Sequence, residues 1–129
     1  NGGFNGLADR RAAFRKAVFG RDRYRCLVCG RQWSEADEAP ELGRINAHHI
    51  TDRHEFPNGG YVPENGVTVC EGACHMACEE FHRSGGTRSA EGLSPSDLYV
   101  KVGSTFVQAL AADAANITNT STAKRSHRR

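Results

Sequence analysis

The stretch CEGACHMACE (residues 70–79) contains a close pair of cysteines, Cys70 and Cys74, at the start of a run with helical character. A second close pair, Cys26 and Cys29, occurs far upstream in the segment CLVC. Two close pairs separated by a long insert are typical of a four-cysteine zinc site. Each pair can sit on a tight turn, so that all four sulfur atoms converge on one ion at about 2.3 Å. The sequence therefore predicts a structural Zn²⁺ held by these four residues.

The remaining cysteine, Cys78, has no obvious partner. An odd number of cysteines, five in all, disfavours a framework of disulfide bonds and favours the metal site. The simplest interpretation of Cys78 is a small buried apolar side chain. It is also a rival zinc ligand, because a helix through this segment would place Cys74 and Cys78 on the same face. A chain of 129 residues, 38% of them hydrophobic, has a thin core, so zinc binding would supply part of the folding energy.

Hydrophobic periodicity divides the chain into short elements around these cysteines. The expected elements are a helix at about residues 8–19, strands at 44–50 and 66–70 joined by a turn-rich loop at 51–65, a helix at 73–83, and one or two helices within 94–115, broken near Gly103. This order predicts an α+β fold class: a small zinc-stapled ββα domain with flanking helices. We expect one domain over residues 1–115, with its core motif at 26–83 and a flexible basic tail at 116–129.

Two adjacent histidines, His48 and His49, lie in the first predicted strand, in the segment NAHHI. Neighbouring side chains of a strand point to opposite faces of the sheet. The two imidazoles therefore cannot easily serve the same site, and we interpret them as one metal ligand and one proton acceptor. Three histidines outside this pattern are expected at the surface: His54, His82 and His127.

The segments CLVCG, AHHI, GGYVPENGVTVC and CHMACE occur in an order that resembles the HNH endonuclease family, which has the ββα-metal (His-Me finger) fold. One departure is the second cysteine pair, which has three intervening residues where zinc-containing members usually have two. The resemblance implies a general base at His49 and metal ligands at His48 and His75. It also implies that Asn65 pins the loop carrying the base, and Glu79 stands where some relatives have a third ligand.

Elementary chemistry agrees with a metal site at these positions. His75 and Glu79 are four residues apart and would share one face of the predicted helix. A strand histidine, His48, would complete a site of two nitrogens and one oxygen that is open to water. Such ligands suit Mg²⁺, Mn²⁺, Ni²⁺ or Zn²⁺ as the single catalytic metal.

The base itself needs a defined tautomer. We expect His49 to act near its ordinary pKa of about 6.5. We also expect the Asn65 side-chain carbonyl to accept a hydrogen bond from one ring nitrogen and leave the other free. Taken alone, Asn65 in the segment PEN is more simply a turn residue.

Charge is spread unevenly along the chain, although the net charge is only +2. Residues 10–31 are rich in arginine and contain a single acid, Asp22. Among the charged residues of the segment 32–82 acids outnumber bases, and residues 124–129 are again basic. Basic segments of this kind predict a polyanion partner, here DNA bound mainly through its phosphates, with plain solvated faces as the alternative. Three arginines are candidates for contact with the scissile phosphate: Arg44, Arg53 and Arg83.

The leading hypothesis from the sequence is a metal-dependent HNH endonuclease that hydrolyses DNA. The alternative is a non-catalytic zinc-stapled nucleic-acid-binding module, which would need the cysteines and the basic segments but not the histidines in family order. The apolar runs are too short to cross a bilayer, and we expect an intracellular (cytoplasmic) protein. Small standalone members of the family it resembles occur in phages, in mobile elements, in restriction and in DNA packaging, and the sequence does not choose among these settings.

Overall fold

Two short antiparallel strands form the centre of the protein. β1 (Ile45–His49) pairs with β2 (Gly66–Cys70), with Ile45 opposite Cys70 and His49 opposite Gly66. The computed structural model describes residues 6–125, and side chains within the last helix are described up to residue 116. Both strands lie where β-branched and alternating residues predict them.

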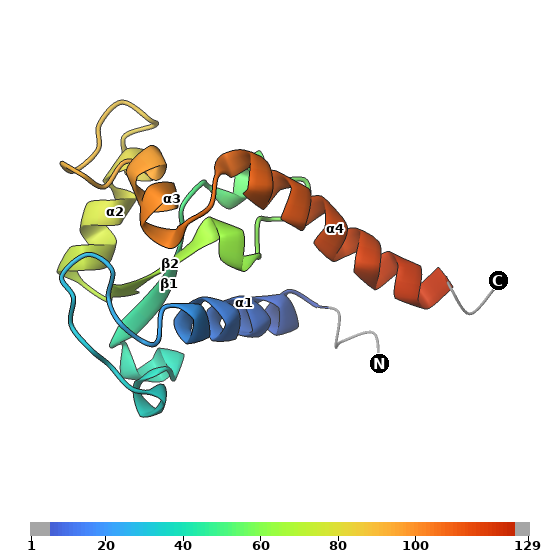
Figure 1. Ribbon diagram of the computed structural model, residues 1–129, viewed down its shortest axis with the longest axis horizontal. Helices are drawn as coiled ribbons and strands as arrows, with labels where there is room; N and C mark the ends of the chain where they lie inside the picture. Colours follow the sequence, from blue (N-terminus) through green and yellow to red (C-terminus); the bar gives the residue numbers. More distant parts are fainter. Residues whose placement is uncertain (1–5, 126–129) are drawn as a thin grey trace.

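Four helices accompany this two-stranded sheet in the described part of the chain, giving a small α+β fold (Figure 1). The helices are α1 (Leu7–Arg21), α2 (Ala73–Arg83), α3 (Pro95–Val102) and α4 (Phe106–Arg125). Single 3₁₀ turns occupy Glu35–Asp37, Pro40–Leu42, Arg53–Glu55 and Pro63–Asn65. α1 lies along one side of the strand pair, α2 and α3 lie on the other, and α4 extends away from the body (Figure 1).

The face of the sheet that contacts α1 is closed by aromatic and branched residues. Phe14 and Val18 of α1 are buried here, together with Tyr61 from the long loop. Gly66 lies at the closest contact, where an added Cβ would come within 2.8 Å of the Phe14 ring. Only glycine therefore allows α1 to pack so near the end of β1 where His49 lies.

The opposite face carries the main hydrophobic core. Val67 and Val69 of β2 pack there with Cys78 of α2 and with Leu98 and Tyr99 of α3. The single buried residue of α2 is Cys78, which is 1% exposed. This position confirms that Cys78 packs as a small apolar group, and burial raises the pKa of its thiol to about 11.

The C-terminal helices begin and break as their sequence predicts. Ser94 caps α3, accepting a hydrogen bond from the Asp97 backbone N–H at 3.2 Å, and Gly103 ends it with a left-handed φ of 76°. α4 then continues to Arg125, so the expectation that helical structure ends at residue 115 is wrong. An existing helix is extended at much lower cost than a new one is nucleated, which outweighs the poor helix propensity of the Asn, Thr and Ser residues there. The rest of the expected tail, 126–129, lies outside the described residues.

Across residues 6–125, no helix combines the length and the apolar character that a membrane crossing requires.

Candidate metal centres and the histidine pair

Four cysteines converge at one end of the strand pair. The sulfur atoms of Cys26, Cys29, Cys70 and Cys74 all lie within 4.8 Å of one another. Those of Cys29 and Cys70 are 3.6 Å apart. Tetrahedral zinc with bonds of about 2.3 Å separates its sulfurs by about 3.8 Å, so the cluster can hold a metal ion such as zinc.

Local backbone geometry builds this cluster. The Cys29 N–H donates a hydrogen bond to the Cys26 sulfur at 3.4 Å, and the turn is completed by Gly30 with a φ of 84°. The Leu27 N–H donates to the Thr68 carbonyl at 3.0 Å, which fastens this turn to the edge of β2. The first cysteine pair is thereby brought to the end of the strand that carries Cys70.

The electrostatics of the four thiols favour a cation among them. Burial, together with the neighbouring Cys26, raises the pKa of Cys74 to about 12. Burial also tends to raise the pKa of Cys26, but backbone hydrogen bonds from Cys29 and Cys70 outweigh it and lower that pKa to about 7. The Trp33 ring N–H donates to the Cys70 sulfur at 3.3 Å. Hydrogen-bond donors and crowded thiols together are the surroundings of a metal-bound thiolate cluster.

A second group of metal-binding side chains lies where β1 meets α2. His48 Nδ1 and His75 Nε2 lie 3.1 and 3.3 Å from the same oxygen of Glu79, and one ligand atom from each residue lies within 4.8 Å of the others. Metal–ligand bonds of about 2.1 Å place neighbouring ligand atoms about 3.0–3.4 Å apart in tetrahedral or octahedral geometry. The structure therefore brings together the three residues that the sequence predicts as one site.

The protonation states of His48 and Glu79 suit a cation at this second cluster, whereas contact with Glu79 raises the pKa of His75, so that a cation there competes with a proton. His48 is 1% exposed, and burial lowers its pKa although Glu79 acts in the opposite direction. Neither His48 ring nitrogen has a partner with hydrogen-bond geometry within the described residues, so the short contact to Glu79 is not a true hydrogen bond. Contacts with His48 and His75 lower the pKa of Glu79 far below its usual range. A neutral imidazole that has no hydrogen-bond partner among the described residues and lies beside a carboxylate has the form in which imidazole can bind a metal.

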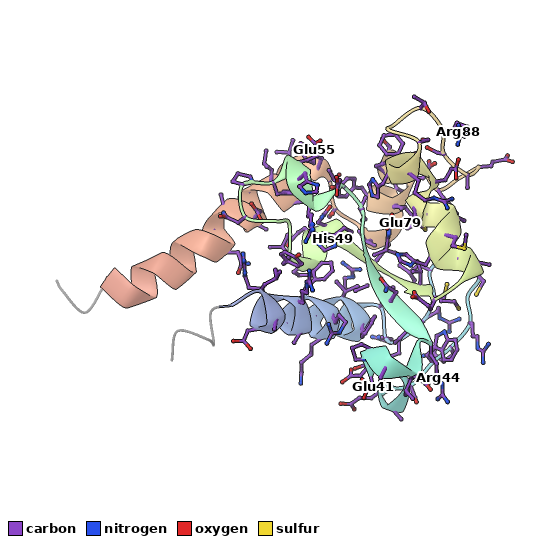
Figure 2. The ribbon with its side chains drawn as sticks, turned by 180° about the vertical axis from the view of Figure 1, so that it is seen from behind. Glu41, Arg44, His49, Glu55, Glu79 and Arg88 are labelled. Carbon is purple, nitrogen blue, oxygen red and sulfur yellow. The ribbon has the colours of Figure 1, made fainter. Side chains whose placement is uncertain are left out.

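His49 points to the other side of β1, as the strand alternation predicts (Figure 2). Its ring lies 4.6 Å from the Phe14 ring and 4.8 Å from the Tyr61 ring, centroid to centroid. Burial and the neighbouring His48 lower the pKa of His49 to about 4, so the expectation of an ordinary value near 6.5 is wrong. The aromatic residues that bury this ring come from α1 and from the long loop.

The Gly59 backbone lies near the His49 ring. It raises the pKa of His49 against the effect of burial, as a neighbouring carbonyl acceptor does. Nε2 is buried and has no hydrogen-bond partner among the described residues. The Gly59 contact therefore engages Nδ1–H and leaves Nε2 with its lone pair.

The Asn65 side chain makes hydrogen bonds to the loop that follows β1 and to Tyr99 rather than the expected hydrogen bond with the His49 ring. Its Oδ1 accepts hydrogen bonds from the Thr51 N–H and the Tyr99 hydroxyl, both at 2.9 Å. Its Nδ2 donates to the carbonyls of Thr51 and Gly60 at 3.1 and 3.2 Å. These bonds satisfy the side chain, so the predicted contact with the His49 ring is replaced by the Gly59 carbonyl. Asn65 pins both ends of the loop that follows β1, and it is not a simple turn residue.

A hollow of about 290 Å³ lies beside His49. Three arginines line it: Arg11, Arg15 and Arg53. Of the three arginines considered from the sequence, Arg53 alone lines this hollow. Arg44 pairs with Asp37 at 2.7 Å, at the opposite end of β1 (Figure 2), and Arg83 pairs with Glu80 at 2.8 Å. The spacing of Arg11 and Arg15, four residues apart on the predicted helix, was the available signal for the two that were missed.

Two arginines of α1 are engaged in holding the fold. Arg10 donates to the Asn58 carbonyl at 3.2 Å, and Arg21 donates to the carbonyls of Pro63 and Gly66 at 2.7 Å. Part of the basic character of α1 is therefore used within the fold itself. The side chains at the basic end of the chain, residues 124–129, lie outside those that the structure describes.

Two histidines outside the motif differ in their surroundings. His54 is exposed as expected, with a contact of 3.2 Å to Asp52. His82 is not a plain surface residue, because its ring stacks on His48 with centroids 5.5 Å apart and its Nε2 donates to the His49 carbonyl at 3.1 Å. Its place seven residues, or two helical turns, after His75 on the same helical face was the signal for this contact. His127 lies outside the described residues.

No family model, curated protein or solved structure matches this chain. The fold and the two clusters define a small α+β protein in which four cysteines can hold a metal ion such as zinc.

Proposed function

We propose that this protein is a metal-dependent endonuclease of the HNH type, which hydrolyses DNA phosphodiester bonds. One observation carries the proposal: the end of β1 presents an unpartnered imidazole nitrogen on one side and a cluster of three metal-binding side chains on the other. Hydrolysis of a phosphodiester needs a proton acceptor for the attacking water and a cation close to the departing oxygen. His49 and the group of His48, His75 and Glu79 match these two needs.

His49 is the proposed general base. With a pKa of about 4 it is neutral at pH 7, so its Nε2 can accept a proton from water. A negative phosphodiester beside the ring favours the imidazolium and raises this pKa again when substrate is bound. The Gly59 carbonyl, which accepts from the opposite nitrogen, stabilises the imidazolium as it forms.

His48, His75 and Glu79 are the proposed ligands of the catalytic metal. Two imidazoles and a carboxylate suit Mg²⁺, Mn²⁺, Ni²⁺ or Zn²⁺. A divalent ion at this site would supply a positive charge for the phosphate oxygens and the leaving oxygen. Burial of His48 and its contact with Glu79 fix these ligands before any substrate arrives.

The proposed partner is DNA, bound mainly through its phosphates. Arg11, Arg15 and Arg53 line the hollow beside His49, which places positive charge where the strand would pass. Each phosphate neutralised by such a side chain releases counterions, so we expect affinity to fall steeply as salt rises. The four-cysteine cluster, as a structural Zn²⁺ site, would hold the strand pair and α2 in this arrangement.

The direct test is cleavage of supercoiled plasmid with Mg²⁺, Mn²⁺ or Ni²⁺, with EDTA as the metal-free control. We expect His49→Ala to lose about 10²–10⁴-fold in rate, the usual worth of a general base. His54→Ala is the matched control, since His54 is an exposed histidine of the same region, and it should cleave as the wild type does.

Equal cleavage by the wild type and His49→Ala would contradict the proposal. So would salt-dependent DNA binding by the wild type without cleavage in any of the metals. The second result would favour a non-catalytic zinc-stapled nucleic-acid-binding module.

A further inference from the structure

Asp113 is a fully buried acid that the proposed catalytic groups do not include. It lies on α4 and is 0% exposed. It is also the sole acid in the sequence of that helix, within the alanine-rich segment LAADAAN. An ionisable side chain is rarely buried completely unless its oxygens have fixed partners.

The partners of the Asp113 carboxylate are backbone groups of the long loop. Oδ1 accepts from the Gly60 N–H at 2.8 Å, and Oδ2 accepts from the Asn58 N–H at 2.9 Å. The Asn58 side-chain amide also donates to the Asp113 carbonyl at 3.2 Å. The carboxylate thus accepts hydrogen bonds from the two residues on either side of Gly59, which are Asn58 and Gly60.

Tyr61, the residue that follows Gly60, packs edge-on against the His49 ring with centroids 4.8 Å apart, and the Gly59 backbone raises the pKa of His49. Gly59 and Gly60 have left-handed φ angles of 89° and 67°. Because glycine can adopt many other backbone conformations, this pair keeps these angles only when other groups hold the turn. Arg10 and Asn65 contact the same turn through the carbonyls of Asn58 and Gly60. Asp113 binds the N–H groups, so the turn is held from both its donor and its acceptor side.

We propose that Asp113 is a positioning residue for His49, and that α4 is thereby part of the active site although it touches no reacting atom. The chain of contacts runs from the Asp113 carboxylate through the turn at Asn58–Gly60 to the His49 ring. This inference rests on the proposed function, because a positioned base matters only where His49 accepts a proton.

The test compares Asp113→Asn with Ala114→Gly in the full-length protein. Asparagine has nearly the same shape, but its amide nitrogen would face one of the two backbone N–H donors, so one hydrogen bond is lost and the turn shifts. Ala114 is exposed on the same helix, and glycine there weakens α4 without touching the turn. A displacement of about 1 Å can reduce a rate by 10²-fold. We expect Asp113→Asn to lower kcat for plasmid nicking by about 10- to 100-fold with little change in KM, and Ala114→Gly to keep the wild-type kcat.

A second measurement does not depend on cleavage. The ¹H–¹⁵N NMR signals of the imidazoles report the tautomer of His49 and the solvent exchange of its Nδ1–H. We expect a slowly exchanging Nδ1–H in the wild type and in Ala114→Gly, and fast exchange in Asp113→Asn.

An Asp113→Asn variant with the wild-type kcat and a protected Nδ1–H would overturn the inference. An equal loss of kcat in Ala114→Gly would do the same, because weakening of α4 would then be the whole cause. If the wild type cleaves no DNA, the proposed function fails, and the NMR comparison still decides whether Asp113 holds the ring.

Discussion

Replacing Asn65 with alanine is expected to destabilise the protein by about 3 kcal/mol. The side chain is completely buried and makes four hydrogen bonds, two as acceptor and two as donor. Alanine removes all four bonds, and the partly buried backbone groups of Thr51 and the buried carbonyl of Gly60 lose these partners. The substitution therefore acts on the loop that joins β1 to β2 and not on the strands themselves.

The magnitude follows from these bonds. A buried hydrogen bond contributes about 1 kcal/mol net, which gives about 4 kcal/mol for four bonds. The Tyr99 hydroxyl keeps a second partner, the Thr51 hydroxyl at 2.7 Å, so its loss is less than a full bond. The expected total is therefore nearer 3 kcal/mol, a large part of the 5–15 kcal/mol, roughly, that stabilises a typical domain.

Urea unfolding of the zinc-loaded protein, followed by far-UV circular dichroism, measures this difference. Asn46→Ala is the matched control, since Asn46 is a half-buried asparagine of β1 and makes no side-chain hydrogen bond recorded in the described residues. A substitution of that kind changes stability by about 0.5 kcal/mol or less. An Asn65→Ala variant within 1 kcal/mol, roughly, of Asn46→Ala would refute the reasoning, because its four bonds would then contribute nothing measurable.

Three further perturbations test the two clusters and one exposed contact. Cys26→Ser should release zinc and lower Tm sharply, whereas Cys78→Ser should lower Tm but retain zinc. Elemental analysis of the purified variants measures the bound zinc, and zinc retained by Cys26→Ser would count against the structural site. Glu79→Gln should weaken binding of a second divalent ion about tenfold or more in calorimetry while Glu80→Gln does not, and equal affinities would exclude this carboxylate as a ligand. The hydrogen bond from the Tyr24 hydroxyl to Glu38 raises the pKa of Tyr24 from 10.0 to about 12. The stability that this hydrogen bond contributes is therefore complete below pH 10 and is lost as the pH rises toward 12. Tm measured from pH 9 to 12 should therefore fall less steeply in Tyr24→Phe, and parallel curves would contradict this assignment.

Much of the fold could be predicted because it is encoded over short distances in the chain. The strands follow from alternation and β-branched residues, and α2 follows from its spacing and from the Ser84–Gly86 segment that ends it. The four cysteines could be grouped because zinc imposes a fixed geometry on two close pairs. His48, His75 and Glu79 could be grouped because the order of the segments resembles the HNH family, and helical spacing agrees in placing His75 and Glu79 on one face.

The contacts that define the surroundings of His49 could not be predicted in the same way. Phe14 and Tyr61 bury its ring from segments far away in the sequence, and this burial lowers its pKa. The Gly59 carbonyl displaces Asn65 as the partner of the ring, because the Asn65 amide is already occupied by the ends of the loop. A lone aspartate in an alanine-rich helix, Asp113, carries no pattern that indicates a buried partner 53 residues away.

The two clusters are joined through the backbone, and this connection has a physical consequence. Cys74 and His75 are adjacent at the start of α2, so the sulfur that completes the first cluster belongs to the same helical turn as a side chain of the second. Cys70 ends β2, whose other end pairs Gly66 with His49. With a thin core, such a register cannot depend on packing alone. A metal ion held by the four cysteines at one end of the strand pair would therefore fix the geometry at the other end, where His48 and His49 face opposite sides of a single strand.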